Sequence, residues 1–293
     1  MRVTFNMIAN NVLKNLSSNL TRLEKLQNQL SSGKKIIKPS DDPVSTSRLI
    51  ELKSTLNANK QYSRNIDFLK TELNVADKAL QDISSTLTRV KELAVRGANE
   101  TLSQENRNAI AEEVDQLIDH LIQIGNTNVS GRYIFGGYKT SEAPLEKSGN
   151  AVLYKGDGNL RSVEVSNNVL INASPTGKSL FVDSGMFDTL VLLRDALLGG
   201  NISQITETID KIDAISDRVS SELSGLGARL SRVELTSDLL SEKYTKYADL
   251  LSKQEDIEIE EVVLKLYAQQ NVYQASLISA SRALQPSLIN YLG

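Results

Sequence analysis

The stretch "LSSGKKIIKPSDDPV", residues 30–44, divides the chain, because it lies between two long runs of heptad-spaced apolar residues. Gly33 follows the last apolar residue of the first run, where helices commonly end on a left-handed C-cap. Asp42 precedes Pro43, and an acidic N-cap before a proline at the first helical position is a strong helix start. Gly33, Asp42 and Pro43 are therefore the predicted hinge and cap residues of a joint between two helices.

The same stretch could be interpreted as a catalytic loop, with lysines for a phosphate and aspartates for a metal or a proton. A phosphate-binding loop needs G-x-x-x-x-G-K-[ST] between a strand and a helix, and here the second glycine and the hydroxyl residue are missing. Asp41 and Asp42 are neighbours in sequence, so they do not form a preorganised pair across a cleft. Capping explains Asp42 and solvent explains Asp41, which favours the helix break.

Upstream of the joint, leucines at three- and four-residue steps predict a helix with a narrow apolar stripe, in which Gln27 takes the remaining position. The stripe consists of Leu13, Leu16, Leu20, Leu23 and Leu30. Downstream, a second helix is predicted from Pro43 to about Gly97. Its apolar residues step by four and three: Ile66, Leu69, Leu73, Ala76, Leu80, Ile83, Leu87, Val90 and Ala94.

The centre of the chain changes its pattern. A third helix is predicted around residues 110–124. Residues 129 to about 184 carry short β-branched runs with "GDGN" and "NN" turns, which predicts a small antiparallel β region. A short helix then ends at Gly199 and Gly200.

The longest predicted helix starts after the cap residue Asn201 and keeps its heptad spacing to about residue 254, so it needs a partner helix along its whole length. The spacing slips at "KQEDIEIEE", and a last helix follows until Pro286. Its stripe consists of Ile259, Val263, Leu266, Tyr273, Leu277, Ala280 and Leu284. We predict that this stripe and the Leu13–Leu30 stripe form an assembly interface.

The order of elements is close to palindromic, with a heptad helix at each end and the β region in the middle. This predicts a mainly α fold with a small β-rich insertion: a long antiparallel coiled-coil rod built from the N- and C-terminal segments, with the β region at its far end. The expected parts are a terminal coiled-coil assembly domain (1–40 with 256–293), a helical rod domain (41–128 with 185–255) and a β-rich outer domain (129–184).

The composition contains few residues that could act in catalysis or bind a metal ion. The chain of 293 residues has no cysteine and one histidine, His120, so thiolate zinc sites and cysteine nucleophiles are excluded. His120 falls on the flank of its helix, and the carboxylates of "DIEIEE" are typical of a solvated helix start. We therefore predict no catalytic residue, no metal and no cofactor. The net charge of -3 argues against nucleic acid, and neither a secretory signal nor a membrane span is evident.

Several stretches resemble the flagellin superfamily: "LQNQLSSGKKIIKPSDDPV", "LKTELNVADKALQDISSTLTRVKELAVRGAN", "GARLSRVE" and the terminal "YQASLISASRALQPSLINYL". Within the superfamily, "PSDDPV" together with "GRYIFGGYKT" is more similar to the proteins of the hook–filament junction than to flagellin. The resemblance covers both ends and part of the centre.

The resemblance implies a non-catalytic structural adaptor of the bacterial flagellum that joins the hook to the flagellin filament. Its implied partners are hook-associated protein 1, flagellin, copies of itself in a ring and an export chaperone before secretion. It also implies export without cleavage through the flagellar type III channel and an extracellular location. A chain without disulfides can be threaded unfolded through such a channel.

Other functions stay open at this point. A flagellin-type subunit would form a long homopolymer, so its copy number would distinguish it from an adaptor. A secreted adhesin would lose its activity when residues 129–184 are deleted, whereas an adaptor should still assemble. An enzyme is the remotest alternative, since no pair of nucleophile and base is evident.

Overall fold

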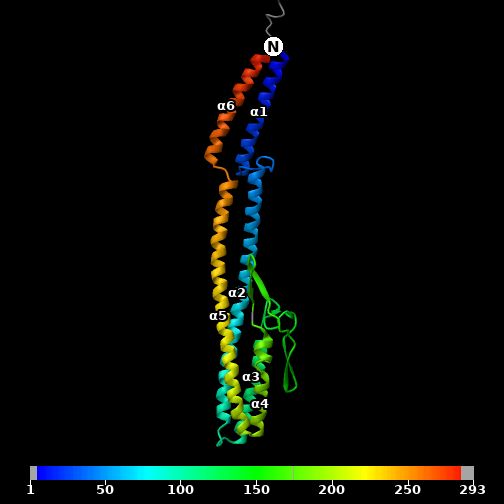
Figure 1. The fold of residues 1–293 in the computed structure, drawn as a ribbon, viewed down its shortest axis with the longest axis vertical. Coiled ribbons are helices and arrows are strands. Elements are labelled where there is room, and N and C mark those ends of the chain that lie inside the picture. Colours follow the sequence, from blue (N-terminus) through cyan, green and yellow to red (C-terminus); the bar gives the residue numbers. More distant parts are fainter. Residues whose placement is uncertain (1–4, 174, 285–293) are drawn as a thin grey trace, which may run out of the picture. The chain divides into compact units, whose positions relative to one another are not determined.

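The computed structural model describes residues 5–173 and 175–284, without the side chains of residues 5, 6, 8, 283 and 284. This part of the chain is mainly helical, as predicted, with short strands between the third and fourth α-helices (Figure 1). Its α-helices are α1 (Phe5–Ser32), α2 (Pro43–Gly97), α3 (Gln104–Gly125), α4 (Met186–Gly199), α5 (Ile202–Glu255) and α6 (Ile259–Leu284).

The contacts divide the chain into two compact units. Unit 1 comprises residues 1–58 and 243–293, and unit 2 comprises residues 59–242, so that α2 and α5 contribute to both. The predicted three-part division, with boundaries near residues 40 and 256, stays a prediction.

In unit 1, α1 and α6 lie side by side and run antiparallel (Figure 1). Asn19 links the two helices: its Nδ2 donates to Ser276 Oγ at 2.8 Å, and its backbone oxygen accepts from Gln269 Nε2 at 3.2 Å. The pairing of the first and last helices, predicted from the palindromic order, is therefore present.

The core of unit 2 is the predicted stripe of α2. The apolar residues of this stripe, which begins at Ile66 and ends at Ala94, are each at most 1% exposed. The inner residues of α5, from Ile205 to Leu240, belong to the same core. Two surface ion pairs, Lys70–Glu234 at 3.3 Å and Lys91–Asp213 at 2.5 Å, join the antiparallel helices. Such exposed pairs are worth little, so apolar burial supplies most of the stability.

The turn from α2 to α3 is closed by a buried arginine. Arg107 is 7% exposed, and its guanidinium donates to Gly97 O at 3.2 Å and Asn99 O at 2.9 Å. A cation is favourable there, because the last carbonyls of a helix are unpaired and carry partial negative charge. Gly97 suits this close packing, because a Cβ at this position would lie 2.4 Å from Leu197 Cδ2 and the leucine side chain would have to shift.

The strands of the described residues are antiparallel, as predicted, and form three separate pairs, which was not predicted. They are β1 (Asn128–Val129) with β2 (Arg132–Tyr133), β3 (Leu145–Ser148) with β4 (Ala151–Tyr154), and β5 (Ser162–Ser166) with β6 (Val169–Asn172). Ser130 and Gly131 both have positive φ, 52° and 79°, which matches the turn that two-residue hairpins favour. A π-helix, η1 (Lys178–Val182), was not predicted.

The position of the strands differs from the prediction in one respect. The β region was expected at the far end of the rod. Instead, in unit 2 it contacts the middle of α2: Tyr62 Oη donates to Glu164 at 3.4 Å, and Arg161 pairs with the buried Glu72. The reason is that α3 runs back along α2 before the first strand begins, which the sequence pattern did not reveal.

Candidate assembly face and joint

The predicted stripe of α1 is only partly turned toward α6. Leu16, Leu23 and Leu30 are half-buried, whereas Leu13 and Leu20 are 53% and 39% exposed. The missing inner positions are taken by Val12, Asn19 and Leu26, which are half-buried and lie one residue away from the predicted ones. The leucines of α1 therefore occupy two faces of the helix.

The stripe of α6 behaves in the same way. Val263, Leu266 and Tyr273 are half-buried and Ala280 is 6% exposed, but Ile259 and Leu277 are exposed. The side chain of Leu284 lies outside the described residues. Further large apolar side chains of α6 that the sequence analysis did not include are also exposed: Leu264, Tyr267, Val272 and Ile278.

These exposed residues lie on the α1–α6 pair outside its inner seam. Single exposed apolar residues are normal, so their number on these two helices is the feature of interest. Whether the predicted residues form an assembly interface stays a prediction.

The joint between α1 and α2 has the predicted caps. Gly33 has a φ of 71°, and its N–H donates to Gln29 O at 2.9 Å. Asp42 Oδ1 accepts from the N–H groups of Val44 at 3.1 Å and Ser45 at 3.0 Å, while Pro43 is the first residue of α2. The pKa of Asp42 lies below its usual value, mainly because of a hydrogen bond with the side chain of Ser45 and then because of the one from the Ser45 N–H.

Asp41 is more than a solvated carboxylate, contrary to the prediction. Its Oδ2 accepts from Lys38 N at 3.1 Å and, more weakly, from Ile37 N at 3.4 Å. The bond from Lys38 is the main cause of its lowered pKa. Asp41 therefore holds the loop between the helices in shape.

The linkers 33–42 and 256–258 meet in the joint. Lys35 N donates to Glu255 O at 2.7 Å, and Ile257 N donates to Gly33 O at 3.0 Å. The Glu255 side chain is 8% exposed, and its Oε1 accepts from Lys53 Nζ at 2.7 Å and from Lys34 Nζ. Burial raises the pKa of Glu255, but the two lysines lower it more, so the pKa lies below its usual value.

We call Lys34, Lys53 and Glu255 the Glu255 cluster. It borders a cavity of about 380 Å³ whose apolar lining includes Ile37 and Leu49. The cluster was not predicted from the sequence, because Lys34 and Glu255 are more than 200 positions apart and no local pattern links them.

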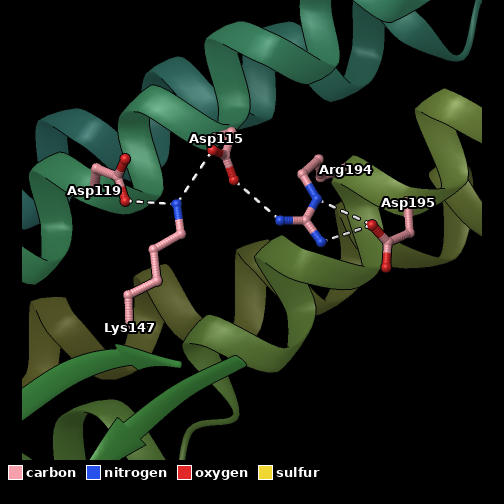
Figure 2. A network of polar contacts seen from close by, with 5 residues as sticks. All are labelled: Asp115, Asp119, Lys147, Arg194 and Asp195. Atoms are coloured by element: carbon pink, nitrogen blue, oxygen red, sulfur yellow. Dashed lines mark hydrogen bonds and ion pairs between the residues drawn. The ribbon is translucent and has the colours of Figure 1, made fainter. Parts of the chain in front are cut away.

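A second polar cluster lies in unit 2 and ties three elements together (Figure 2). Lys147 of β3 contacts two carboxylates of α3, Asp119 at 2.7 Å and Asp115 at 3.2 Å. Arg194 of α4 contacts Asp115 at 3.0 Å and its neighbour Asp195 at 2.8 Å. Both cations are paired with carboxylates, so this cluster fits a structural clamp beside its cavity of about 460 Å³.

The other residues that could bind a metal or take part in catalysis do not lie together. Within residues 5–173 and 175–284, no three His, Cys, Asp or Glu residues are grouped so that they could hold a metal ion. His120 is exposed on α3, and Glu261 of "DIEIEE" pairs with Lys265 one turn along α6. No helix of the described part is long and apolar enough to span a membrane.

Comparisons with known proteins agree with the resemblance. The profile of the bacterial flagellin N-terminal helical region matches residues 3–140. The matched residues include all of α1, α2 and α3. Flagellar hook-associated protein 3 of Salmonella typhimurium is 25% identical over 303 residues, which cover 94% of this chain and 95% of that protein. The Escherichia coli protein of the same name is 28% identical over 182 residues, or 62% of this chain and 57% of that protein.

Flagellins are also similar: that of Bacillus subtilis is 24% identical over 298 residues, or 97% of each chain. Among solved structures, a putative flagellar hook-associated protein from Vibrio parahaemolyticus has a TM-score of 0.67 and 23% identity. The match covers 74% of this chain and 100% of that one. Bacillus cereus FlgL has a TM-score of 0.60 and 24% identity, over 69% of this chain and 99% of that one. These superpositions establish a shared fold.

Proposed function

We propose that the protein is a structural adaptor of the bacterial flagellum that joins the hook to the flagellin filament. The observation that carries the proposal is the match to hook-associated protein 3 along 94% of this chain and 95% of that relative. A partial match would have left open that only the shared terminal helices are alike.

The exposed apolar residues of unit 1 support the same function. An adaptor must contact several neighbours, and the α1–α6 pair retains Leu13, Leu20, Ile259 and Leu277 at its surface after it has paired. We propose that these residues, with the inner seam between α1 and α6, form the assembly interface, and that Gly33, Asp42 and Pro43 set the change of direction between α1 and α2.

The finer parts of the proposal follow from the family. The partners are hook-associated protein 1 on the hook side, flagellin on the filament side, copies of the chain in a ring, and an export chaperone in the cell. The protein is exported to the outside of the cell and has no catalytic role. The three-part division into terminal, rod and β-rich domains is the arrangement proposed for the assembled state.

The test is genetic and structural. A strain that lacks its own junction protein should regain attached filaments when it expresses this chain. Labelled protein should then lie in a short band between hook and filament. Filaments labelled along their whole length would show instead that the chain is a filament subunit.

A flagellin-type filament subunit is the second candidate. It is favoured by the match to Bacillus subtilis flagellin over 97% of both chains. Purified protein seeded on filament fragments distinguishes the two: a filament subunit extends the fragments alone, whereas an adaptor adds a short segment and stops.

A further inference from the structure

The two linkers of the joint are tied together by a very small piece of sheet. Lys34 and Asp256 form one antiparallel bridge, with the hydrogen bonds Lys35 N to Glu255 O and Ile257 N to Gly33 O. Two isolated backbone hydrogen bonds are a weak tie, because each one replaces a hydrogen bond to water. The bridge therefore needs additional support to stay closed.

The Glu255 cluster provides this support from three elements. Lys34 belongs to the first linker, Lys53 to α2 and Glu255 to the last turn of α5, and both ammonium groups contact the same carboxylate oxygen. The three groups depend on one another. Without the carboxylate the two lysines repel each other at short range, and without the lysines a carboxylate that is 8% exposed would be buried unpaired.

The first linker has its own means of keeping its shape. Asp41 accepts the N–H groups of Ile37 and Lys38, and Lys25 lies 3.6 Å from its carboxylate. None of these contacts involves the second linker. The cluster is therefore not needed to shape the loop, and its contacts serve to join one linker to the other.

We propose that the Glu255 cluster makes the two linkers open and close as one event, so that α1 and α6 change direction together. In the closed state both lysines contact Glu255 and the backbone bridge is formed. In the open state the carboxylate and the lysines are solvated and both bridge hydrogen bonds are broken. The joint is then a two-state device and not two independent hinges.

The test is amide hydrogen exchange of the purified full-length chain, read at Lys35 and Ile257. In the unchanged protein the two amides should have the same protection factor, because one opening exposes both. Glu255→Gln should lower both protection factors by about tenfold or more, since the lysines lose the charge that holds them. Glu207→Gln is the matched control: it removes a carboxylate of the exposed Glu207–Lys211 pair in α5 and should leave both values unchanged.

Lys53→Gln distinguishes coupling from a local effect. Lys53 lies on α2, outside both linkers, and donates to Glu255 Oε1, yet its loss should lower the protection of Lys35 and Ile257 in equal proportion. The ion pairs of the Glu255 cluster can also be weakened without a mutation, by adding salt. Lys34 and Lys53 are 45% and 47% exposed, so salt at about 1 M, where the Debye length is about 3 Å, should lower both protection factors. The Glu255→Gln variant should show no such response.

Three outcomes would overturn the proposal. The first is unequal protection of the two amides in the unchanged protein. The second is unchanged protection in Glu255→Gln. The third is an effect of Lys53→Gln on Lys35 alone. If Glu255→Gln loses helix content in circular dichroism, the Lys53→Gln and salt measurements still decide, because they leave the buried carboxylate in place.

Discussion

The side-chain amide of Asn126 pairs with the backbone of Leu145: Nδ2 donates to Leu145 O at 2.8 Å, and Leu145 N donates to Oδ1 at 2.9 Å. A side chain thus takes the place of a neighbouring strand at the start of β3. Leu145 itself is 3% exposed and belongs to the core of unit 2. This pair fixes the first residue of the β3–β4 hairpin to the end of α3.

Asn126→Ala should therefore destabilise unit 2. The change removes both hydrogen bonds and leaves the N–H and C=O of the buried Leu145 unpaired, which costs about 1–3 kcal/mol per group. Urea unfolding at neutral pH measures the loss. Asn150→Ala, in the exposed turn between β3 and β4, is the control and should be nearly neutral. Equal stabilities for the two variants would mean that Asn126 does not anchor the hairpin.

Gly125→Ala tests how tightly the β3–β4 hairpin packs against the end of α3. A Cβ at Gly125 would lie 2.2 Å from Leu145 Cδ1 and 3.1 Å from Phe181 Cζ, so the core must shift. Overpacking of this kind costs about 1–3 kcal/mol. Gly227→Ala in α5 should have the opposite sign, since a Cβ there meets nothing within 4 Å and alanine gains up to about 1 kcal/mol over glycine in a helix. A melting temperature that rises for Gly125→Ala would contradict this.

The sequence predicts the parts of the fold that depend on local signals. The caps at Gly33, Asp42 and Gly200 are local, and so is the burial of the α2 stripe, whose heptad spacing has no competing apolar face. That α1 pairs with α6 could be predicted, because two helices with narrow apolar stripes at the chain ends need partners.

The exact inner face of α1 was not predictable. Leucines lie on two faces of this helix, and one inner position is the polar Asn19, which is satisfied by Ser276 and Gln269 about 250 positions away. The Glu255 cluster and the clamp around Lys147 were missed for the same reason. Each joins charged residues from distant segments, and such residues look like ordinary surface charges in the sequence.

The clamp between Lys147 and Asp115 should make unit 2 sensitive to pH. Burial raises the pKa of Asp115, but Arg194 and Lys147 lower it more, so its pKa is below the ordinary value of about 3.9. Its ionised form therefore contributes stability above that pH, and the contribution is lost as the pH falls through the lower pKa of the folded state. The hydrogen bond to Asp119 is the main reason that the pKa of Lys147 is raised, so its contribution is lost only as the pH rises through that higher value.

The measurement is the free energy of unfolding of Asp115→Asn relative to the unchanged protein, at several pH values. The variant should be less stable at neutral pH. The difference should shrink as the pH falls from about 4 through the lower pKa of the folded state, because only below that pKa is the carboxylate of the unchanged protein protonated in both states. Asp67→Asn, at an exposed position of α2, is the control. A difference that grows toward acid pH would show that ionised Asp115 does not stabilise unit 2.

The last prediction separates the apolar surface of unit 1 from the core of unit 2. Leu13 and Leu277 are 53% and 42% exposed, so Leu13→Ala with Leu277→Ala should barely change the melting temperature of the monomer. If these residues contact neighbouring subunits, the same pair should strongly reduce assembly onto filament ends, because the loss recurs at every interface. Incorporation of labelled protein at filament ends, beside the motility of complemented cells, measures this.

The matched control is Leu80→Ala with Leu87→Ala. Both residues are 0% exposed in α2, and truncating a buried leucine costs about 2–5 kcal/mol, so this pair should lower the melting temperature directly. Any assembly defect of this control should disappear at a temperature where the variant is folded, whereas the defect of the surface pair should persist. If the surface pair melts much lower and the core pair does not, the two apolar surfaces have been assigned the wrong way round. If the surface pair assembles normally, Leu13 and Leu277 lie outside the interface.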